Sequence, residues 1–344
     1  MGSEMCIRDR NNTHLWDLID TLETKIESLG FKYEAPEEEE TRIEVTFVGR
    51  PNVGKSSLLN TLVDKKRSVV SDVSGTTRDS IDSYYTDEDG QDYTFIDTAG
   101  LRKRSKQVDI EYWSGVRTVR AIERSDVCVV MLDALDGVTH QDMTIIGPVI
   151  EAGKGLIIAV NKYDLLQEKS RAREETDERE LDELDMWGED LDKMREKYIA
   201  YLSRKLPFCT WAPVVFFSAK TGKGIKDLLP SIKGIAQERE KRITTSELNN
   251  YLPDLKYGHV LPSVGNKVGK MKYMTQAENK PPTFLLFVNN EEAFHFSYRR
   301  YLENRIREKY GFQGTPIKIK IRDARDERHE KPKPSQKKGP SRDV

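Results

Sequence analysis

The stretch that decides the fold of this chain is residues 47–56, which read FVGRPNVGKS. It ends an apolar run typical of a buried strand, Ile43–Val48, and precedes the helix-forming residues Leu58 and Leu59. The pattern G-x-x-x-x-G-K-S between a strand and a helix is that of a P-loop. Its glycines let the backbone approach phosphates closely, and the helix N-terminus favours their negative charge. The stretch therefore predicts a nucleotide-phosphate site.

Individual residues of this loop have predicted roles. Lys55 is expected to reach the β- and γ-phosphates and to act in catalysis, while the Ser56 hydroxyl binds Mg²⁺. Asn52 offers a carbonyl oxygen close to the phosphates, which suits a monovalent cation; hydrogen bonding within the loop is the alternative. The residues expected to contact the nucleotide here are Gly49, Asn52, Val53, Gly54, Lys55, Ser56 and Ser57.

A second motif, DTAG at residues 97–100, follows a predicted strand about forty residues after Lys55. An aspartate at this point, Asp97, can hold Mg²⁺ through water, and the Gly100 N–H can bond the γ-phosphate in catalysis. By itself the motif is weak evidence for a nucleotide site, but its position after the P-loop makes it strong evidence.

The loop between these two motifs contains GTTRD at residues 75–79. Thr77 is the better candidate for the second Mg²⁺ hydroxyl and a catalytic position, with Thr76 as the alternative. This loop is expected to order with the γ-phosphate and to loosen after hydrolysis. Leu101 occupies the place where Ras-like enzymes carry a glutamine that orients water, so hydrolysis must draw on another group.

Two later motifs predict selectivity for guanine. In NKYD at residues 161–164, the Asp164 carboxylate can accept two hydrogen bonds from guanine, and Asn161 braces the loop. The stem of Lys162 would lie over the base. The segment SAK closes the same pocket with backbone N–H groups at guanine O6. The residues expected to bind the base are Asn161, Lys162, Asp164, Ser218, Ala219 and Lys220.

The fold class expected from the order of elements is α/β. From Ile43 to about Glu238, apolar strands alternate with helical stretches, which indicates a doubly wound, mostly parallel sheet. An α-β-β-α-β order follows and predicts a small α+β domain with a three-stranded sheet. The predicted organisation is a non-native scar at residues 1–10, an amphipathic helix at 11–33, an acidic linker at 34–41, a P-loop domain at 42–238, a small α+β domain at 239–322 and a basic, disordered tail at 323–344. A charged insertion between Tyr163 and Pro207 is expected to be partly helical.

The charge of the chain is divided unevenly. Residues 239–344 hold 23 basic and 13 acidic residues, whereas residues 1–238 hold 33 basic and 45 acidic residues. A basic C-terminal part suggests an anionic partner, nucleic acid first, with a solvated tail as the alternative. No apolar run is long enough for a membrane span, and no signal peptide is recognised. Three scattered cysteines argue against a disulfide framework and fit a reducing cytoplasm.

Five motifs together resemble those of the TRAFAC-class GTPases: GRPNVGKSSLLN, GTTRD, DTAGLRKR, NKYD and SAKTGKG. The resemblance is greatest to the bacterial Der (EngA) family of ribosome-assembly GTPases, which carry two G domains and a C-terminal KH-like domain. RRYLENRIREKYGFQGTPIKIKIR resembles the end of that KH-like domain, and the match covers roughly Ile43 to Arg322.

This resemblance implies binding and hydrolysis of GTP with Mg²⁺, a potassium ion near Asn52 and the GTTRD loop, and binding to the large ribosomal subunit and its rRNA in the cytoplasm. A single G domain is seen here, and the helix at residues 11–33 resembles the end of a preceding one. Alternatives are an RNA-associated GTPase like Era or MnmE, or a scaffold that holds nucleotide and RNA without turnover, which Leu101 keeps open.

A G-x-x-G pattern at Gly311–Gly314 matches the letter of the nucleotide-clamping loop of KH domains. It follows the last helix and precedes a strand, so we interpret it as a helix C-cap and turn. Any RNA contacts of this domain are expected instead from basic side chains: Arg299, Arg300, Arg305, Lys318 and Lys320.

Overall fold

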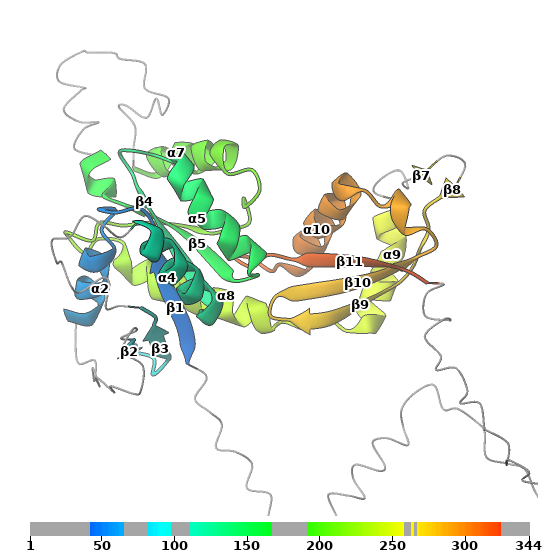
Figure 1. Cartoon of the computed structure of the whole chain (residues 1–344), viewed down its shortest axis with the longest axis horizontal. Helices are drawn as coiled ribbons and strands as arrows, with labels where there is room; N and C mark the ends of the chain where they lie inside the picture. Colours follow the sequence, from blue (N-terminus) through cyan, green and yellow to red (C-terminus); the bar gives the residue numbers. More distant parts are fainter. Residues whose placement is uncertain are drawn as a thin grey trace, which may run out of the picture. The chain divides into compact units, whose positions relative to one another are not determined.

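The structure, a computed structural model, describes residues 42–64, 82–97, 111–166, 191–257, 263–264 and 267–324. The chain from Ile43 onward forms one compact unit, whose helices and strands are labelled in Figure 1. The predicted scar, N-terminal helix, acidic linker and most of the basic tail lie outside the described residues. We call residues 43–240 the first domain and residues 241–324 the second domain.

The first domain is built on a six-stranded sheet with the order β2-β3-β1-β4-β5-β6. Only β2 is antiparallel to its neighbour, which confirms the predicted mostly parallel sheet. β4 and β5 each lie between two other strands, and all of their residues are buried, as expected from continuous apolar runs. The strands are β1 Ile43–Val48, β2 Ser83–Thr86, β3 Asp92–Phe95, β4 Val127–Asp133, β5 Gly155–Asn161 and β6 Val214–Phe216.

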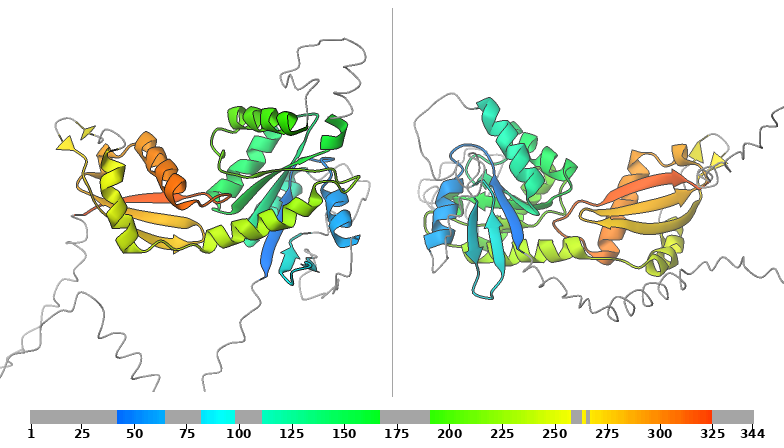
Figure 2. Two further views of the ribbon diagram at one scale, coloured as in Figure 1. Left: turned by 180° about the vertical axis from the view of Figure 1, so that it is seen from behind. Right: turned by 60° about the horizontal axis from the view of Figure 1, so that its bottom comes forward.

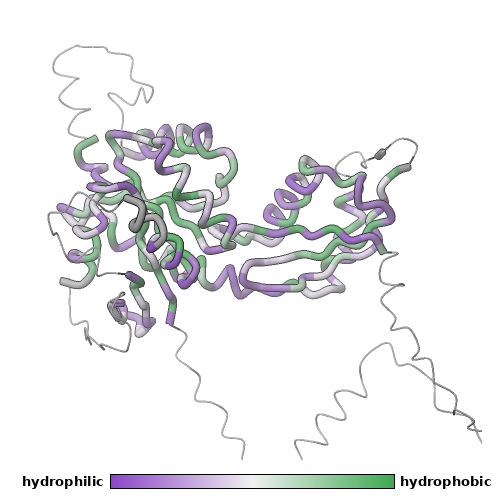
Figure 3. Tube along the Cα trace, in the orientation of Figure 1, coloured by the Kyte–Doolittle hydropathy of each residue, from purple (hydrophilic) through white to green (hydrophobic). Residues whose placement is uncertain are grey.

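Helices cover both faces of this sheet (Figure 2). One apolar core joins it to α5, α7 and the end of α4, and a second joins it to α2 and α8. The green strands and largely purple outer helices of Figure 3 reflect this division between core and surface. The helical segments are α2 Lys55–Asp64, α4 Glu111–Arg124, α5 His140–Glu151, α7 Leu191–Lys205, the 3₁₀ turn η1 Ile225–Asp227 and α8 Leu228–Glu240.

The second domain has the predicted α-β-β-α-β order. It also contains a short hairpin, whose two strands have two residues each, and a 3₁₀ turn. Its three-stranded sheet has the order β11-β10-β9, with β10 parallel to β11 and antiparallel to β9. Its apolar core lies between this sheet and α9 and α10. The elements are α9 Thr245–Tyr257, β7 Ser263–Val264, β8 Lys267–Val268, β9 Met271–Asn279, β10 Pro282–Val288, η2 Glu291–Ala293, α10 Phe296–Tyr310 and β11 Lys318–Asp323.

The sequence pattern predicts strands at Tyr93–Asp97, Val214–Ser218 and Ile317–Ile321, and the C-terminal ends of these strands differ in the structure. β3 ends at Phe95, before the predicted Asp97, because Asp97 has a φ of 56° that a strand cannot contain. β6 ends at Phe216 since the Ser218 N–H turns back to the Lys223 carbonyl at 3.0 Å. β11 continues to Asp323, and the Ala324 N–H still donates to the Val288 carbonyl at 2.9 Å.

The Gly311–Gly314 segment packs against the first domain, which supports its interpretation as a turn. Gly311 follows α10 with a φ of 90°, and Phe312 is fully buried. The Gly314 N–H donates to the Trp211 carbonyl at 3.0 Å, and its own carbonyl accepts from the Leu156 N–H at 2.7 Å. A backbone engaged in this way cannot clamp a nucleotide strand.

Candidate functional site

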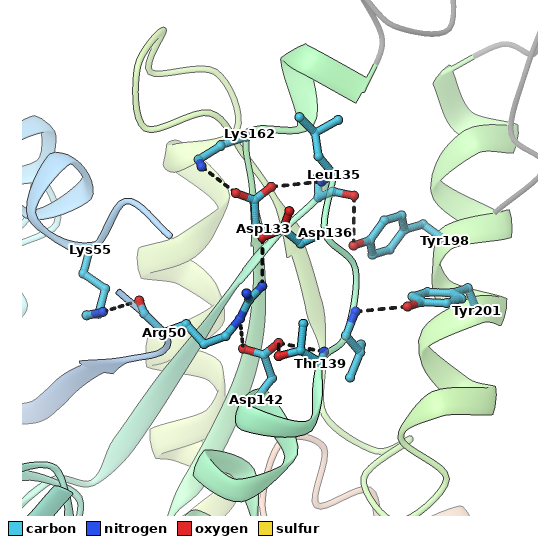
Figure 4. A network of polar contacts seen from close by, with 12 residues as sticks. Arg50, Lys55, Asp133, Leu135, Asp136, Thr139, Asp142, Lys162, Tyr198 and Tyr201 are labelled. Atoms are coloured by element: carbon cyan, nitrogen blue, oxygen red, sulfur yellow. Dashed lines mark hydrogen bonds and ion pairs between the residues drawn. The ribbon is translucent and has the colours of Figure 1, made fainter. Parts of the chain in front are cut away.

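The P-loop joins β1 to α2 and encloses the side chain of Lys55. Its ammonium donates to the carbonyls of Gly49 at 2.7 Å and Arg50 at 2.6 Å, as Figure 4 shows in part. Burial lowers the pKa of Lys55 to about 8, because the charged form loses hydration without gaining a carboxylate partner. A ligand phosphate would supply the missing negative charge.

Asn161 connects the two halves of the site. Its side-chain N–H donates to the Val53 carbonyl at 2.7 Å, and its side-chain oxygen accepts from the Ala219 N–H at 2.9 Å. A Cβ on Gly54 would lie 2.1 Å from that amide nitrogen, so only glycine fits beneath the link. The predicted bracing role of Asn161 thus has a geometric basis.

Asp164, three residues after the end of β5, holds a buried carboxylate oxygen, Oδ1, that has no hydrogen-bond partner among the described residues. Such an atom costs free energy unless a ligand supplies a donor. The nearby Ser218 and Ala219 N–H groups are already bonded to Lys223 and Asn161. Of the three predicted donors for guanine O6, these two are therefore engaged within the protein, and Lys220 is left as the candidate.

The side chain of Lys162 is held by Asp133 at the end of β4. The ammonium and Asp133 Oδ2 are 2.5 Å apart, and Asp133 Oδ1 accepts from the Leu135 N–H at 2.9 Å. Lys162 itself has a φ of 62°, which turns the chain sharply after β5. Asp133 is buried at the end of β4, so its carboxylate holds the Lys162 side chain in one orientation.

Arg50 ties the P-loop to the start of α5 (Figure 4). Its guanidinium Nε donates to Asp142 at 3.0 Å and its Nη2 donates to Asp136 at 3.2 Å. Asp142 is fully buried and also accepts from the Thr139 N–H at 2.9 Å, completing a capping box. One arginine thereby joins the phosphate loop to the loop between β4 and α5.

That loop between β4 and α5 is supported from α7 by two tyrosines. The Val138 N–H donates to the Tyr201 hydroxyl at 3.0 Å, and the Tyr198 hydroxyl donates to the Ala134 carbonyl at 3.5 Å. The hydroxyl of Tyr201 also fills the space where a Cβ on Gly137 would lie, 2.5 Å away. Both tyrosines belong to the hydrophobic core, so the loop rests on a rigid helix.

Asp97, the predicted Mg²⁺ residue, lies beside β1 after β3. Its backbone N–H donates to Asp82 at 3.0 Å, and Asp82 also pairs with Arg124 at 2.5 Å. The pKa of Asp97 is raised, chiefly by burial and further by Asp82, while Arg117 and Arg124 oppose the shift. A bound cation would favour the ionised form and offset this burial.

The structure brings together most of the predicted site. The P-loop, Asn161–Asp164 and the Ser218–Lys220 turn meet through Asn161, as the ends of parallel strands should. Ser56 lies half-buried in the first turn of α2, and Asn52 is exposed with a φ of 64°. The catalytic candidates Thr77 and Gly100 and the GTTRD loop lie outside the described residues.

Sequence reasoning missed four residues that orient the predicted ones: Arg50, Asp82, Asp133 and Asp142. Each acts on a group far away in the chain, so no local spacing identifies it. The available signal was the position of Asp133 at the end of a buried strand, where a charged residue needs a partner.

Metal-binding clusters and membrane-spanning helices are both absent from the described part of the chain. No group of three or more His, Cys, Asp or Glu side chains there could hold a metal ion. No helix among the described residues is long and apolar enough to cross a membrane.

Two family descriptions and several known proteins match this chain. The family described as 50S ribosome-binding GTPase matches residues 44–162, and that described as the C-terminal KH-domain-like domain of EngA bacterial GTPase enzymes matches residues 242–322. GTPase Der of Acetivibrio thermocellus is 40% identical over 331 residues, covering 95% of this chain and 68% of the relative. The chain belongs to the GTPase Der family.

The chain spans only part of the Der proteins that it matches. GTPase Der of Ruminiclostridium cellulolyticum is 44% identical over 286 residues, which cover 83% of this chain and 60% of the relative. For GTPase Der of Caldanaerobacter subterraneus the identity is 41%, with 93% and 66% covered.

Similarity to solved structures is more distant. Era from Aquifex aeolicus, bound to GDP and aluminium fluoride, is 18% identical with a TM-score of 0.38, covering 81% of this chain and 91% of that one. The G domain of the T. maritima FeoB iron transporter is 21% identical with a TM-score of 0.34, covering 56% and 98%.

Proposed function

We propose that this chain binds GTP and hydrolyses it to GDP and phosphate in the presence of Mg²⁺. The observation that carries the proposal is the buried Asp164 Oδ1, to which no residue in the described part of the chain donates a hydrogen bond. Guanine presents two adjacent donors, N1–H and N2–H₂, that would satisfy this carboxylate, whereas adenine does not. Lys162, fixed by Asp133, lies beside it to cover the base.

The P-loop supports the phosphate half of this proposal. Lys55 would exchange its two backbone carbonyl partners for phosphate oxygens, which compensate its charge more strongly. Gly49 has a φ of 148°, and a Cβ there would lie 2.6 Å from the Met131 carbonyl, so only glycine lets the loop backbone pass this close to β4. Mg²⁺, held by Ser56, Thr77 and Asp97, would neutralise developing negative charge on the phosphates.

Hydrolysis needs a group that positions water, and Leu101 offers none. We propose a potassium ion held by Asn52 and the GTTRD loop, with Gly100 N–H at the γ-phosphate. Asn52 is exposed in the left-handed region, an unusual conformation that leaves its side chain accessible. Potassium should then raise turnover above that in sodium, and equal rates would limit Asn52 to a loop-stabilising role.

The biological setting we propose is assembly of the large ribosomal subunit in the cytoplasm, with that subunit and its rRNA as partners. The family description as a 50S ribosome-binding GTPase and the basic C-terminal part both favour it. Turnover above the protein-free background distinguishes this switch from a scaffold that only holds nucleotide.

Substitution at the base pocket tests the nucleotide assignment. Asp164→Asn should weaken GTP binding and improve xanthosine triphosphate binding, because the asparagine amide complements the carbonyl at the base 2-position. Lys55→Ala should abolish binding of both nucleotides. Asp89→Asn, in the exposed turn between β2 and β3, is the control and should bind GTP as before. An unchanged preference in Asp164→Asn would disprove the guanine pocket.

Co-sedimentation with purified large subunits tests the biological setting. Binding should differ between GDP and a non-hydrolysable GTP analogue and should persist at a second, higher salt concentration. Binding that ignores the nucleotide and disappears with salt would indicate generic attraction to phosphates instead.

A further inference from the structure

The three-stranded sheet of the second domain has one face that the described helices leave open. Alternate residues of β10 point in opposite directions: Phe284, Leu286 and Val288 are fully buried in the core with α9 and α10. Leu285 and Phe287 therefore point to the other side, where both are partly exposed. We call this side the outer face; its strands can be followed in both views of Figure 2.

Strand register identifies the neighbours on the outer face. Phe287 is opposite Tyr273 on β9 and Arg322 on β11, while Leu285 is opposite Thr275 and Lys320. Residues directly opposite each other share a face of the sheet. The outer face is thus made of Tyr273, Thr275, Leu285, Phe287, Lys320 and Arg322.

Two aromatic rings form the centre of the outer face. The centroids of Tyr273 and Phe287 are 5.9 Å apart, and the planes are inclined by 48°. Tyr273 is 44% exposed, an unusually large fraction for an aromatic residue of a strand. A solvent-exposed aromatic pair on a sheet is a surface that a ligand could cover.

The charge beside these rings is positive. Arg322 is exposed, and its side chain makes no hydrogen bond or ion pair with any described residue. Lys320 is half exposed and has only a solvent-accessible contact to Glu278 at 3.4 Å, a pair of little energetic weight. A β-bulge after Phe287 adds the exposed Lys272 beside Tyr273. Among the described residues, Glu278 is the acidic group that pairs with one of these cations.

The outer face is open at one end only. Near Thr283, which is fully buried, Lys318 donates to the Glu151 carbonyl of α5 at 3.1 Å, so the first domain closes that end. Arg300 likewise donates to the Pro207 carbonyl at 2.8 Å, so Lys318 and Arg300, both predicted as RNA contacts, are bonded to the first domain. The open end contains Tyr273, Phe287 and Arg322.

We propose that the outer face binds single-stranded RNA. Bases stack on Tyr273 and Phe287, and Arg322 and Lys320 hold the phosphate backbone. Every base has a flat π-face, and aromatic rings flanked by cations are the usual platform for unpaired nucleotides. In a duplex the base faces are covered, so single strands are preferred. The inference rests on the proposed function, since it assigns the RNA contact of a ribosome-assembly GTPase to one surface.

The buried Gly311–Gly314 segment supports this assignment. Because its backbone is bonded to Trp211 and Leu156, the G-x-x-G loop is not available as an RNA clamp. An RNA contact by the second domain must therefore use another surface, and the outer face combines exposed aromatic rings with unpaired positive charge.

The test measures binding of the full 344-residue chain to fluorescently labelled oligouridine and to an RNA duplex of equal length. Tyr273→Ser should weaken single-strand binding about tenfold, and Tyr273→Trp should retain it. Arg322→Gln should lower affinity and reduce the slope of log affinity against log salt by about 0.7. Photocrosslinking of 5-iodouridine RNA should label Tyr273.

Matched controls are Phe296→Ser, which removes a 77% exposed aromatic ring outside this face, and Lys256→Gln on α9. Both should bind RNA like the parent chain. Equal losses in these controls, an absence of oligouridine binding by the parent chain, or unchanged binding in Tyr273→Ser and Arg322→Gln would each overturn the inference. GTP binding and turnover, measured on the same proteins, should not change; their absence in the parent would refute the proposed function separately.

Discussion

The ammonium of Lys162 lies 2.5 Å from Asp133 Oδ2, in an ion pair that joins the ends of the neighbouring strands β5 and β4. The lysine follows Asn161, which bonds both the P-loop and the Ser218–Lys220 turn. A buried carboxylate on one strand thus orients the side chain that we propose covers the base. Asp133 would then be a positioning residue for the nucleotide.

Replacement of Asp133 by asparagine should weaken GDP and GTP binding about tenfold, because an amide still accepts from Leu135 but no longer binds Lys162 as an ion. Equilibrium titration with a fluorescent guanine nucleotide measures the effect. Lys162→Met keeps the apolar stem and serves as the partner variant. If the two residues act together, the double variant should lose less than the sum of both changes; additive losses would contradict the coupling.

The low pKa of Lys55 predicts that nucleotide affinity falls with rising pH. In the free protein this pKa is about 8, and bound phosphates would raise it. Above about pH 8, binding must therefore take up a proton, and affinity should fall between about pH 7.5 and pH 9. Calorimetry at about pH 8.5 in two buffers of different ionisation enthalpy measures this uptake; identical binding enthalpies in the two buffers would argue against it.

Replacement of Arg50 by glutamine should lower the free energy of unfolding by about 2 kcal/mol, because the fully buried Asp142 loses its cation. Nucleotide affinity should also fall, since the P-loop is no longer attached to α5. Denaturant unfolding and nucleotide titration measure the two effects. Asp136→Asn removes only the exposed partner and should change the unfolding free energy by less than about 0.5 kcal/mol. Equal effects of the two variants would be inconsistent with the role of Asp142.

Replacement of Gly54 by alanine should abolish nucleotide binding. The new Cβ would lie 2.1 Å from the Asn161 amide, and the residue has a φ of 101° that alanine disfavours. Gly234→Ala in α8 is the matched control, because no atom lies within 4 Å of its Cβ position. It should bind nucleotide normally and gain up to about 1 kcal/mol in unfolding free energy. Normal binding by Gly54→Ala would show that the Asn161 link is dispensable.

Much of the candidate site could be predicted because its motifs are contiguous. The P-loop, NKYD and SAK each follow an apolar strand, and parallel strands place their carboxyl ends at one edge. Arg50, Asp82 and Asp142 could not be recognised in this way. Arg50 occupies an unspecified position of the P-loop pattern, so the pattern assigns it no role. Its partner Asp142 is 92 residues away in the chain.

The sequence by itself determined the order of elements and the P-loop motif, and it predicted the residues that select a base, because backbone conformation and side-chain periodicity are local properties. Only the tertiary structure decided which carboxylate holds Lys162, that Gly311–Gly314 is buried against the first domain, and that Tyr273 and Phe287 meet on an open face. These relationships depend on strand register and on packing between distant segments. A side chain's partner across a sheet or a domain boundary is set by the whole fold, and no spacing along the chain encodes it.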